Sequence, residues 1–248
     1  MTASSDFAGR IVLITGGTSG IGLSLARALD ASGAKVLICA RNPAGIEAAR
    51  SGLKQADGFV CDVADPAQVA AMLEAIRERY GRLDILVANV GGLSEFDFTA
   101  APLEAAALTR ELELNLVAPV LLVNQALPLL RLGSRPSLVM LGSGFGWSPS
   151  RRAPLYSAAK AGIRAFVVSL RLQLAPLGVH VMEVVPPTVD TPAVAHRSAP
   201  KISADTMAAA IVKGLRRRSR EAFAGQTRAM PLMLRLAPRL LERITGKS

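Results

Sequence analysis

The chain has 248 residues, of which 50% are apolar and 19% are charged, and its formal net charge is +10. A chain of this length and composition can bury a sizeable core as one domain, and it is neither disordered nor of low complexity. The charge is uneven, because from residue 197 onward twelve basic residues accompany only three acidic ones. Such a field could attract nucleic acid, anionic lipid or an acidic partner, but a solvated helical face is the commoner explanation.

The first residues and the two cysteines bear on location. The opening segment is short and polar, and the apolar run after it is soon broken by threonine and glycine, so neither a signal peptide nor a membrane span is predicted there. Both cysteines fall in apolar runs typical of strands, where a free thiol behaves as a small hydrophobic group. We therefore expect a reducing, cytoplasmic environment and no bound metal.

Six short apolar runs are predicted to be strands, with helical patterns between them. They cover residues 11–15, 35–40, 58–61, 84–88, 137–141 and 180–185. This alternation predicts an α/β fold, in which right-handed crossovers build a doubly wound, Rossmann-like parallel sheet with helices on both faces. We expect a single domain over residues 1–248, with a basic tail at 225–248. Ligands of such sheets bind beyond the carboxyl ends of the strands.

A glycine-rich turn joins the first predicted strand to the first helix. Residues 15–22 read TGGTSGIG, a spacing that differs from the GxGxxG of many dinucleotide folds. Glycines let the backbone approach a pyrophosphate, and the N–H groups of the helix N-terminus bind it. A tight connection is the simpler alternative, but the position after the first strand favours cofactor binding. The predicted contacts are Thr15, Gly16, Thr18, Ser19, Gly20, Ile21 and Gly22.

The ends of the next three strands carry further candidates for cofactor binding. Arg41 and Asn42 follow the second strand, where an acidic residue would favour NAD and a basic one accommodates the 2′-phosphate of NADP(H). The sequence therefore predicts NADP(H), against the alternative of a solvated arginine. A carboxylate at the third strand could accept the adenine amino group, although an aspartate there is often only a cap. The remaining candidates are Asp62, Val63, Asn89, Val90 and Gly91.

A second group of polar residues has the chemistry of acid–base catalysis. Tyr156 and Lys160 are four residues apart in a predicted helix, so they share one face. An ammonium beside a phenol lowers the phenol pKa from about 10 toward neutrality. Ser143 follows the fifth strand, where its hydroxyl could bind an oxygen on which negative charge develops. Asn115 interrupts a helical stretch, and bridging a water is one way to satisfy a buried amide.

In their order and spacing these motifs resemble those of the single-domain short-chain dehydrogenase/reductase family, over nearly the whole chain. The resemblance implies an NADPH-dependent reduction of a carbonyl in which Tyr156 is the general acid. It implies that Lys160 lowers the pKa of Tyr156 and holds the nicotinamide ribose, and that Ser143 orients the substrate. Asn115 would hold a relay water. In the turn at 186–191, Thr191 and the backbone of Val189 would bind the carboxamide, and Pro186 would also contact the cofactor.

Three positions depart from the usual family pattern, and the predicted substrate loops carry aromatic residues. Ala88, Gly142 and Pro187 stand where the family has asparagine, serine and glycine. The loops are expected at 92–98, 145–149 and 192–203. We predict a pocket for an apolar or aromatic ketone or the corresponding alcohol, although aromatic residues near a core edge are often only packing. Its predicted lining is Ser143, Phe145, Trp147 and Pro187.

Partners and rival functions follow from the same features. The resemblance implies a homodimer or homotetramer, paired through long helices at about 102–131 and 156–177. The basic tail mixes leucines with arginines and could make a weak peripheral contact with an anionic membrane. Equally, its leucines could cover the domain or a partner subunit. No recognition motif predicts nucleic-acid binding. The rival function is an NADP-binding regulatory or lipid-surface-associated protein of the same fold with little or no turnover.

Overall fold

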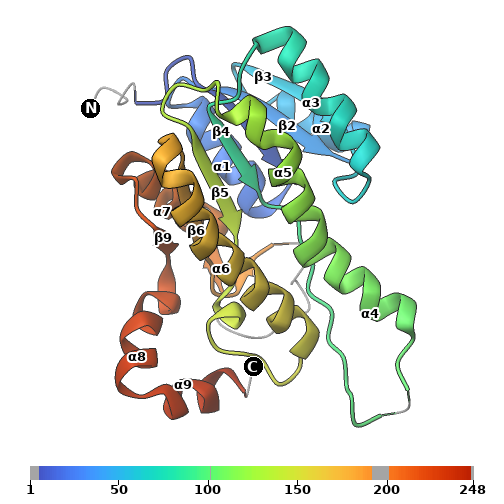
Figure 1. The fold of residues 1–248 in the computed structure, drawn as a ribbon, viewed down its shortest axis with the longest axis vertical. Coiled ribbons are helices and arrows are strands. Elements are labelled where there is room, and N and C mark those ends of the chain that lie inside the picture. The colour runs from blue at the N-terminus through green and yellow to red at the C-terminus, as the bar shows by residue number, and fades with distance from the viewer. Residues whose placement is uncertain (1–5, 101, 192–200, 247–248) are drawn as a thin grey trace.

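The computed structural model describes residues 6–100, 102–191 and 201–246 (Figure 1). Its centre is a seven-stranded sheet in the order β3-β2-β1-β4-β5-β6-β9, with every neighbouring pair parallel. The strands are β1 (Ile11–Thr15), β2 (Lys35–Ala40), β3 (Ala56–Val60), β4 (Ile85–Ala88), β5 (Ser137–Leu141), β6 (His180–Val185) and β9 (Glu221–Phe223). A separate pair joins β7 (Val189–Asp190) to β8 (Ile202–Ser203). The predicted parallel α/β sheet is confirmed.

Four of the six predicted strands have the predicted bounds, and two differ at their ends. The strand expected at 58–61 covers Ala56–Val60, and the one expected at 84–88 begins at Ile85. The seventh strand of the sheet, β9, was not predicted. It has three residues, Glu-Ala-Phe, and it forms by pairing with the carboxyl-terminal half of β6.

Helices cover both faces of the sheet, because alternate strand residues point to opposite sides. Leu13 of β1 packs in the core beneath the helices α3, α5 and α6, whereas its neighbours Val12 and Ile14 pack beneath α1, α2 and α7. The first layer is formed by α3 (Pro66–Tyr80), α5 (Ala118–Leu130) and α6 (Pro154–Leu174). The second is formed by α1 (Gly20–Asp30), α2 (Pro43–Arg50) and α7 (Ala204–Arg217). Cys39 and Cys61 are buried free thiols in the first core.

Of the two long helices expected from the sequence, the first is interrupted and the second is continuous over 21 residues. The first consists of α4 (Ala105–Leu112), a π-helical turn (Glu113–Val117) and α5. Within the described ranges, 105–130 is the stretch long and apolar enough to cross a membrane by length and composition. Here Leu122 and Ala126 are buried against the sheet, as in the core helix of a folded domain. The second long helix, α6, begins at Pro154 and ends in a 3-10 turn (Ala175–Leu177).

A C-terminal arm, residues 225–246, follows β9. It contains a 3-10 turn (Gly225–Ala229), α8 (Met230–Leu236) and α9 (Pro238–Thr245), and it extends beyond the carboxyl end of the sheet (Figure 1). Met230 and Leu241 are buried. The Thr245 Oγ1 lies 2.8 Å from the Ser148 Oγ, within hydrogen-bonding distance, and so ties the arm to the loop after β5.

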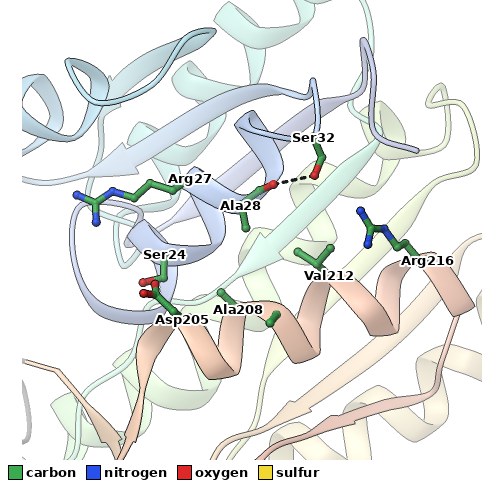
Figure 2. Close-up of a pocket in the computed structure, with 9 residues that line it drawn as sticks. Ser24, Arg27, Ala28, Ser32, Asp205, Ala208, Val212 and Arg216 are labelled. Carbon is green, nitrogen blue, oxygen red and sulfur yellow. Dashed lines mark hydrogen bonds between the residues drawn. The ribbon is translucent and has the colours of Figure 1, made fainter. Parts of the chain in front are cut away.

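An open groove runs between α1 and α7 (Figure 2). Arg216 at its rim is paired with Asp6 at 3.0 Å, and the Ser32 hydroxyl donates to the Ala28 carbonyl oxygen at 2.9 Å. The lining contains none of the residues predicted to bind cofactor or substrate, so we assign the groove no part in the chemistry. It is lined by Ser24, Arg27, Ala28, Ser32, Asp205, Ala208, Ala209, Val212 and Arg216.

Candidate active site

The glycine-rich turn is held in place by Thr15 and Asn89. The Thr15 hydroxyl donates to the Val87 carbonyl oxygen at 3.2 Å and accepts from the Asn89 backbone N–H at 3.0 Å. The Asn89 side-chain amide then donates to the carbonyl oxygens of Thr15 (3.0 Å) and Gly16 (3.3 Å). These two predicted cofactor residues, at the ends of β1 and β4, therefore fix the shape of the turn.

Two glycines in the turn have no room for a side chain. A Cβ atom at Gly22 would lie 2.2 Å from the Gly16 carbonyl oxygen, so only glycine allows the turn to close on the helix. Gly20 has φ +51°, and a Cβ atom there would lie 2.8 Å from the Thr191 Cγ2. The fold thus brings Thr191, predicted to hold the carboxamide, against the glycine-rich turn.

The N-terminus of α1 is suited to binding an anion. Ser19 occupies the N-cap position in an extended conformation, but its side chain caps none of the helix N–H groups. Uncapped N–H groups and the positive end of the helix dipole attract phosphate. The residues of this turn therefore fit the pyrophosphate of a dinucleotide.

The residues predicted to bind the adenosine end have structural partners as well. Arg41 is largely exposed, and its Nη1 lies 3.9 Å from the Asp62 Oδ2. Asn42 caps α2 by accepting from the Ala44 N–H at 3.0 Å, while Asp62 accepts from the Ala64 N–H at the same distance. The side chain of Val63 is buried in the core. Asn42 is therefore a helix cap and Asp62 stabilises a turn before α3, and their contacts with a cofactor stay predictions.

Tyr156 and Lys160 lie one turn apart on α6, with the Lys160 Nζ 5.6 Å from the centre of the Tyr156 ring. Lys160 is buried, and its Nζ donates to the Leu141 carbonyl oxygen at 3.0 Å. Burial lowers the pKa of Lys160 from 10.5 to about 8, and the nearby Glu111 opposes this shift. A group with this pKa changes its charge close to neutral pH, so it can modulate the acidity of the tyrosine.

The loop after β5 brings Ser143 to the same place. The Ser143 Oγ accepts from the Phe145 N–H at 3.1 Å, and the Phe145 ring meets the Tyr156 ring edge-on, with centroids 6.5 Å apart. The Gly144 N–H donates to the Pro186 carbonyl oxygen at 3.1 Å. The carboxyl ends of β5 and β6 therefore meet beside α6, with the predicted serine and tyrosine on adjoining segments.

Asn115 lies in the π-helical turn, close to Lys160. Its side-chain amide donates to the backbone and side-chain oxygens of Glu111, both at 3.1 Å, and its Oδ1 accepts from the Gly92 N–H at 3.2 Å. A Cβ atom on Gly91 would lie 3.0 Å from the Asn115 Oδ1 and 3.3 Å from the Lys160 Nζ, so both groups lie beside Gly91 and leave no room for a side chain there. The predicted relay water stays a prediction.

Comparison with known proteins identifies the family. The family model described as short chain dehydrogenase matches residues 10–201. The chain belongs to this family. It is 39% identical over 180 residues to the oxidoreductase DltE of Bacillus subtilis strain 168, covering 73% of this chain and 71% of the relative. It is 36% identical over 190 residues to putative ketoacyl reductase 1 of the granaticin polyketide synthase of Streptomyces violaceoruber, covering 73% and 68% of the two chains.

A solved structure gives the same assignment. The Pseudomonas aeruginosa RhlG/NADP active-site complex superposes with a TM-score of 0.79 at 25% identity, covering 87% of this chain and 92% of that chain. Membership of the short-chain dehydrogenase family supports an oxidoreductase that uses a nicotinamide cofactor.

Sequence reasoning missed one residue at this short-chain dehydrogenase site. Glu111 is buried beside Asn115 and acts electrostatically on Lys160. The signal available was its position one helical turn before Asn115, which places both on one face.

The predicted substrate residues are only partly described. Pro187 lies near β8 and the C-terminal arm, because a Cβ atom on Gly225 would meet its Cγ at 3.5 Å. The Trp147 indole N–H donates to the Glu183 Oε1 at 3.0 Å, so one edge of this side chain is engaged by the sheet. Most of the third predicted substrate loop, at 192–200, lies outside the described residues. The substrate roles of Trp147 and Pro187 stay predictions.

Proposed function

We propose that this short-chain dehydrogenase reduces a ketone to an alcohol with NADPH, using Tyr156 as general acid. The observation that carries the proposal is the meeting of three groups at one end of the sheet: Ser143 after β5, with Tyr156 and the buried Lys160 on α6. A phenol, a lysine with lowered pKa and a hydroxyl donor are the groups that protonation of a carbonyl oxygen requires.

The protein groups divide the work of the reaction. The nicotinamide cofactor, when bound, supplies the hydride that adds to the carbonyl carbon. The Ser143 hydroxyl donates a hydrogen bond to the carbonyl oxygen as its negative charge develops. The Tyr156 hydroxyl transfers its proton to that oxygen, which completes the alcohol, and the Lys160 ammonium stabilises the phenolate that remains. Solvent then returns a proton to Tyr156.

A panel of ketones and quinones, followed by consumption of NADPH, tests the proposal. We expect turnover with at least one apolar or aromatic ketone, because Phe145 stands beside Tyr156 and relatives are named ketoacyl reductases. The rival function is a regulatory protein that binds NADP with little turnover. Tight binding of NADPH without consumption across the panel would favour that rival.

Preference for NADP(H) is the part of the proposal that Arg41 supports. Its guanidinium is exposed after β2, where it can reach a 2′-phosphate. Replacing Arg41 by alanine should raise the Kd for NADPH about 10- to 100-fold, the range of a charge-assisted contact, with little change for NADH. Titration calorimetry with both cofactors measures this. Arg27→Ala, an exposed change on α1, is the matched control, and an equal loss for both cofactors would contradict the assignment.

A second proposal concerns the C-terminal arm and an anionic membrane surface. Four large apolar side chains on the arm, spaced four residues apart, are more than half exposed: Leu232 (62%), Leu236 (72%), Leu240 (52%) and Ile244 (51%). Exposed arginines at 228, 235, 239 and 243 accompany them, with one exposed acid at 242. Apolar side chains interleaved with cations match an anionic bilayer surface.

Vesicle flotation tests the membrane contact. The protein should float with phosphatidylglycerol vesicles and should bind phosphatidylcholine vesicles much less. Changing Leu232, Leu236 and Leu240 together to serine should abolish flotation, whereas Leu132→Ser, an equally exposed leucine after α5, should leave it intact. These substitutions keep Met230 and Leu241, which anchor the arm. Flotation that is unchanged by the triple substitution would rule out this surface.

We also propose that the protein forms a homodimer or a homotetramer. Exposed apolar side chains on the two long helical segments support it, because such residues are common at subunit contacts. They are Val117, Leu121, Val168 and Leu172.

A further inference from the structure

Strand β6, which lies between β5 and the edge strand β9, carries a buried acid that the proposed chemistry does not use. Glu183 is 1% exposed, and its Oε1 accepts from the Trp147 indole N–H at 3.0 Å. Its Oε2 has no hydrogen-bond partner among the described residues and lies 3.8 Å from the Arg164 Nη1. Burying a carboxylate is costly unless other groups compensate it, so this position is not explained by packing alone.

Trp147 is held on several sides. The Arg164 guanidinium stacks over the indole, with its Cζ 3.2 Å from the ring centre, and the Phe223 ring of β9 meets it edge-on at 5.2 Å. Stacking of this kind and a buried hydrogen bond each favour one orientation of the side chain. Glu183, Arg164 and Phe223 therefore fix Trp147 from β6, α6 and β9.

The residue that is fixed belongs to the loop that carries Ser143. Within the turn, the Gly146 N–H donates to the Ser143 carbonyl oxygen and the Trp147 N–H to the Gly144 carbonyl oxygen, both at 3.0 Å. A Cβ atom at Gly146 would lie 2.7 Å from the backbone of Lys160, so the loop rests directly on α6. An anchored Trp147 thus holds the loop against the helix.

Arg164 connects Trp147 to the face of α6 that carries Tyr156 and Lys160. Tyr156, Lys160 and Arg164 are spaced four residues apart, so they lie along one face of the helix. Arg164 lies one helical turn after Lys160, and its side chain contacts Trp147 there. The Glu183–Trp147–Arg164 cluster therefore joins the Ser143 loop to the helix that carries Tyr156.

Gly142 gives independent support, because Glu183 occupies the space beside it. A Cβ atom at Gly142 would lie 2.6 Å from the Glu183 Oε1. No larger residue fits directly before Ser143 while this carboxylate is in place. Glycine at position 142, where the family usually has serine, and the buried Glu183 are thus sterically linked.

We propose that Glu183 is a positioning residue that acts through Trp147 and Arg164 to hold the Ser143 loop in register with Tyr156 and Lys160. The inference deepens the proposed function and rests on it for its kinetic test. Its spectroscopic test needs no substrate.

The charge of Glu183 can be followed by titration. Burial raises the pKa of Glu183, while Trp147, Arg164 and Arg171 oppose the shift and Glu221 on the neighbouring strand adds to it. A folded-state pKa raised above the unfolded value means that stability is full below the unfolded pKa and falls as pH rises through the folded one. At pH values above the ordinary pKa of glutamate, the burial of Glu183 therefore lowers the stability of the fold.

The Glu183→Gln variant distinguishes a positioning role of Glu183 in catalysis from a role in the stability of the fold. Glutamine keeps an acceptor for the Trp147 N–H but removes the charge opposite Arg164. We expect kcat to fall about 10- to 100-fold, the scale of a small misplacement, with an unchanged Kd for NADPH and a melting temperature at pH 7 that is not lowered. Glu221→Gln, next to it in the sheet and paired with Arg171 at 2.9 Å, should keep kcat. Unchanged kcat in Glu183→Gln, or an equal loss in both variants, would overturn the proposal.

Trp147 is the only tryptophan in the chain, so its emission reports on the cluster. In the wild type, the emission should change with pH at a midpoint above that of an exposed glutamate, about 4.3, and Glu183→Gln should abolish this transition. A transition that persists in Glu183→Gln would contradict the assignment. If no ketone is reduced, the proposed function fails while this titration still decides whether Glu183 controls Trp147.

A double-mutant comparison tests the contact with Gly142. Gly142→Ser should lower kcat or the melting temperature in the wild type, and it should cost less in a Glu183→Ala background, since the contact with the Glu183 side chain is then gone and only the Val184 carbonyl oxygen, 3.0 Å from the same Cβ position, remains. Equal costs in both backgrounds would show that Glu183 is not what excludes a side chain at position 142, and that would overturn the packing argument.

Discussion

Tyr156→Phe is expected to lower kcat by about 10²- to 10⁴-fold, the usual contribution of a positioned general acid. The substitution removes one oxygen and leaves the ring, so the edge-on contact with Phe145 is kept. Because the hydroxyl acts on the substrate and not on the pyrophosphate, the Kd for NADPH should change little. NADPH consumption with a reducible ketone, alongside calorimetric binding of NADPH, measures both quantities.

The chain provides its own control for this experiment, because it has a second tyrosine. Tyr80 lies at the end of α3, and its hydroxyl donates to Asp57, away from the carboxyl ends of the strands. Tyr80→Phe should therefore leave kcat unchanged, although the lost hydrogen bond will lower stability. A Tyr156→Phe enzyme with wild-type turnover would show that the proton comes from elsewhere.

The sheet could be predicted because its strands are buried on both faces. Continuous apolar runs such as 35–40 and 137–141 are typical of central parallel strands, and their bounds follow from the flanking polar residues. The strand β9 has no such pattern, since it has only three residues, one of them a glutamate, and only its middle residue is fully buried. Its structure comes from pairing with β6, a contact that local sequence does not encode.

The sequence predicts site residues whose partners are close in the chain, but it does not predict those whose partners are distant in the chain and meet them only in the folded structure. The four-residue spacing of Tyr156 and Lys160 fixes a shared helical face. By contrast, Glu183 sits in an apolar run that predicts only a strand, and its partner Trp147 is 36 residues away. Asn42 and Asp62 show the opposite difficulty, since the residue types that bind a cofactor at these positions are also the ones that cap a helix, as Asn42 does, or stabilise a turn, as Asp62 does.

Lys160→Met is expected to make the protein more stable at pH 7 while removing most of its activity. Burial lowers the pKa of Lys160 from 10.5 to about 8, so the fold disfavours the ammonium form. For a lowered pKa in a basic group, full stability is present above the unfolded value and is lost as pH falls through the folded one. At pH 7 the buried charge therefore costs on the order of 3 kcal/mol.

Methionine has a similar length and needs no counter-charge, but it leaves the Leu141 carbonyl oxygen without its donor. Leaving this buried acceptor unpaired costs about 1 to 3 kcal/mol, so the net gain should be up to about 2 kcal/mol, or a melting temperature higher by up to about 8 °C. The gain should shrink between pH 7 and pH 10, because the folded wild-type lysine loses its proton above about pH 8 while the unfolded lysine keeps its proton until about 10.5, and the wild type therefore gains stability. Thermal unfolding across this range measures the difference. Lys213→Met, an exposed change on α7, should show no such pH dependence.

The activity of Lys160→Met should fall at least about 100-fold, since no ammonium remains to stabilise the Tyr156 phenolate. The same dependence on the ammonium should appear in the pH profile of the wild type. Its kcat/KM should decrease as pH rises through about 8, where Lys160 loses its charge. A variant that is both less stable at pH 7 and still active would mean that Lys160 is held as a neutral structural donor. A gain in stability together with a loss of turnover would mean that the fold accepts a buried charge because the reaction needs it.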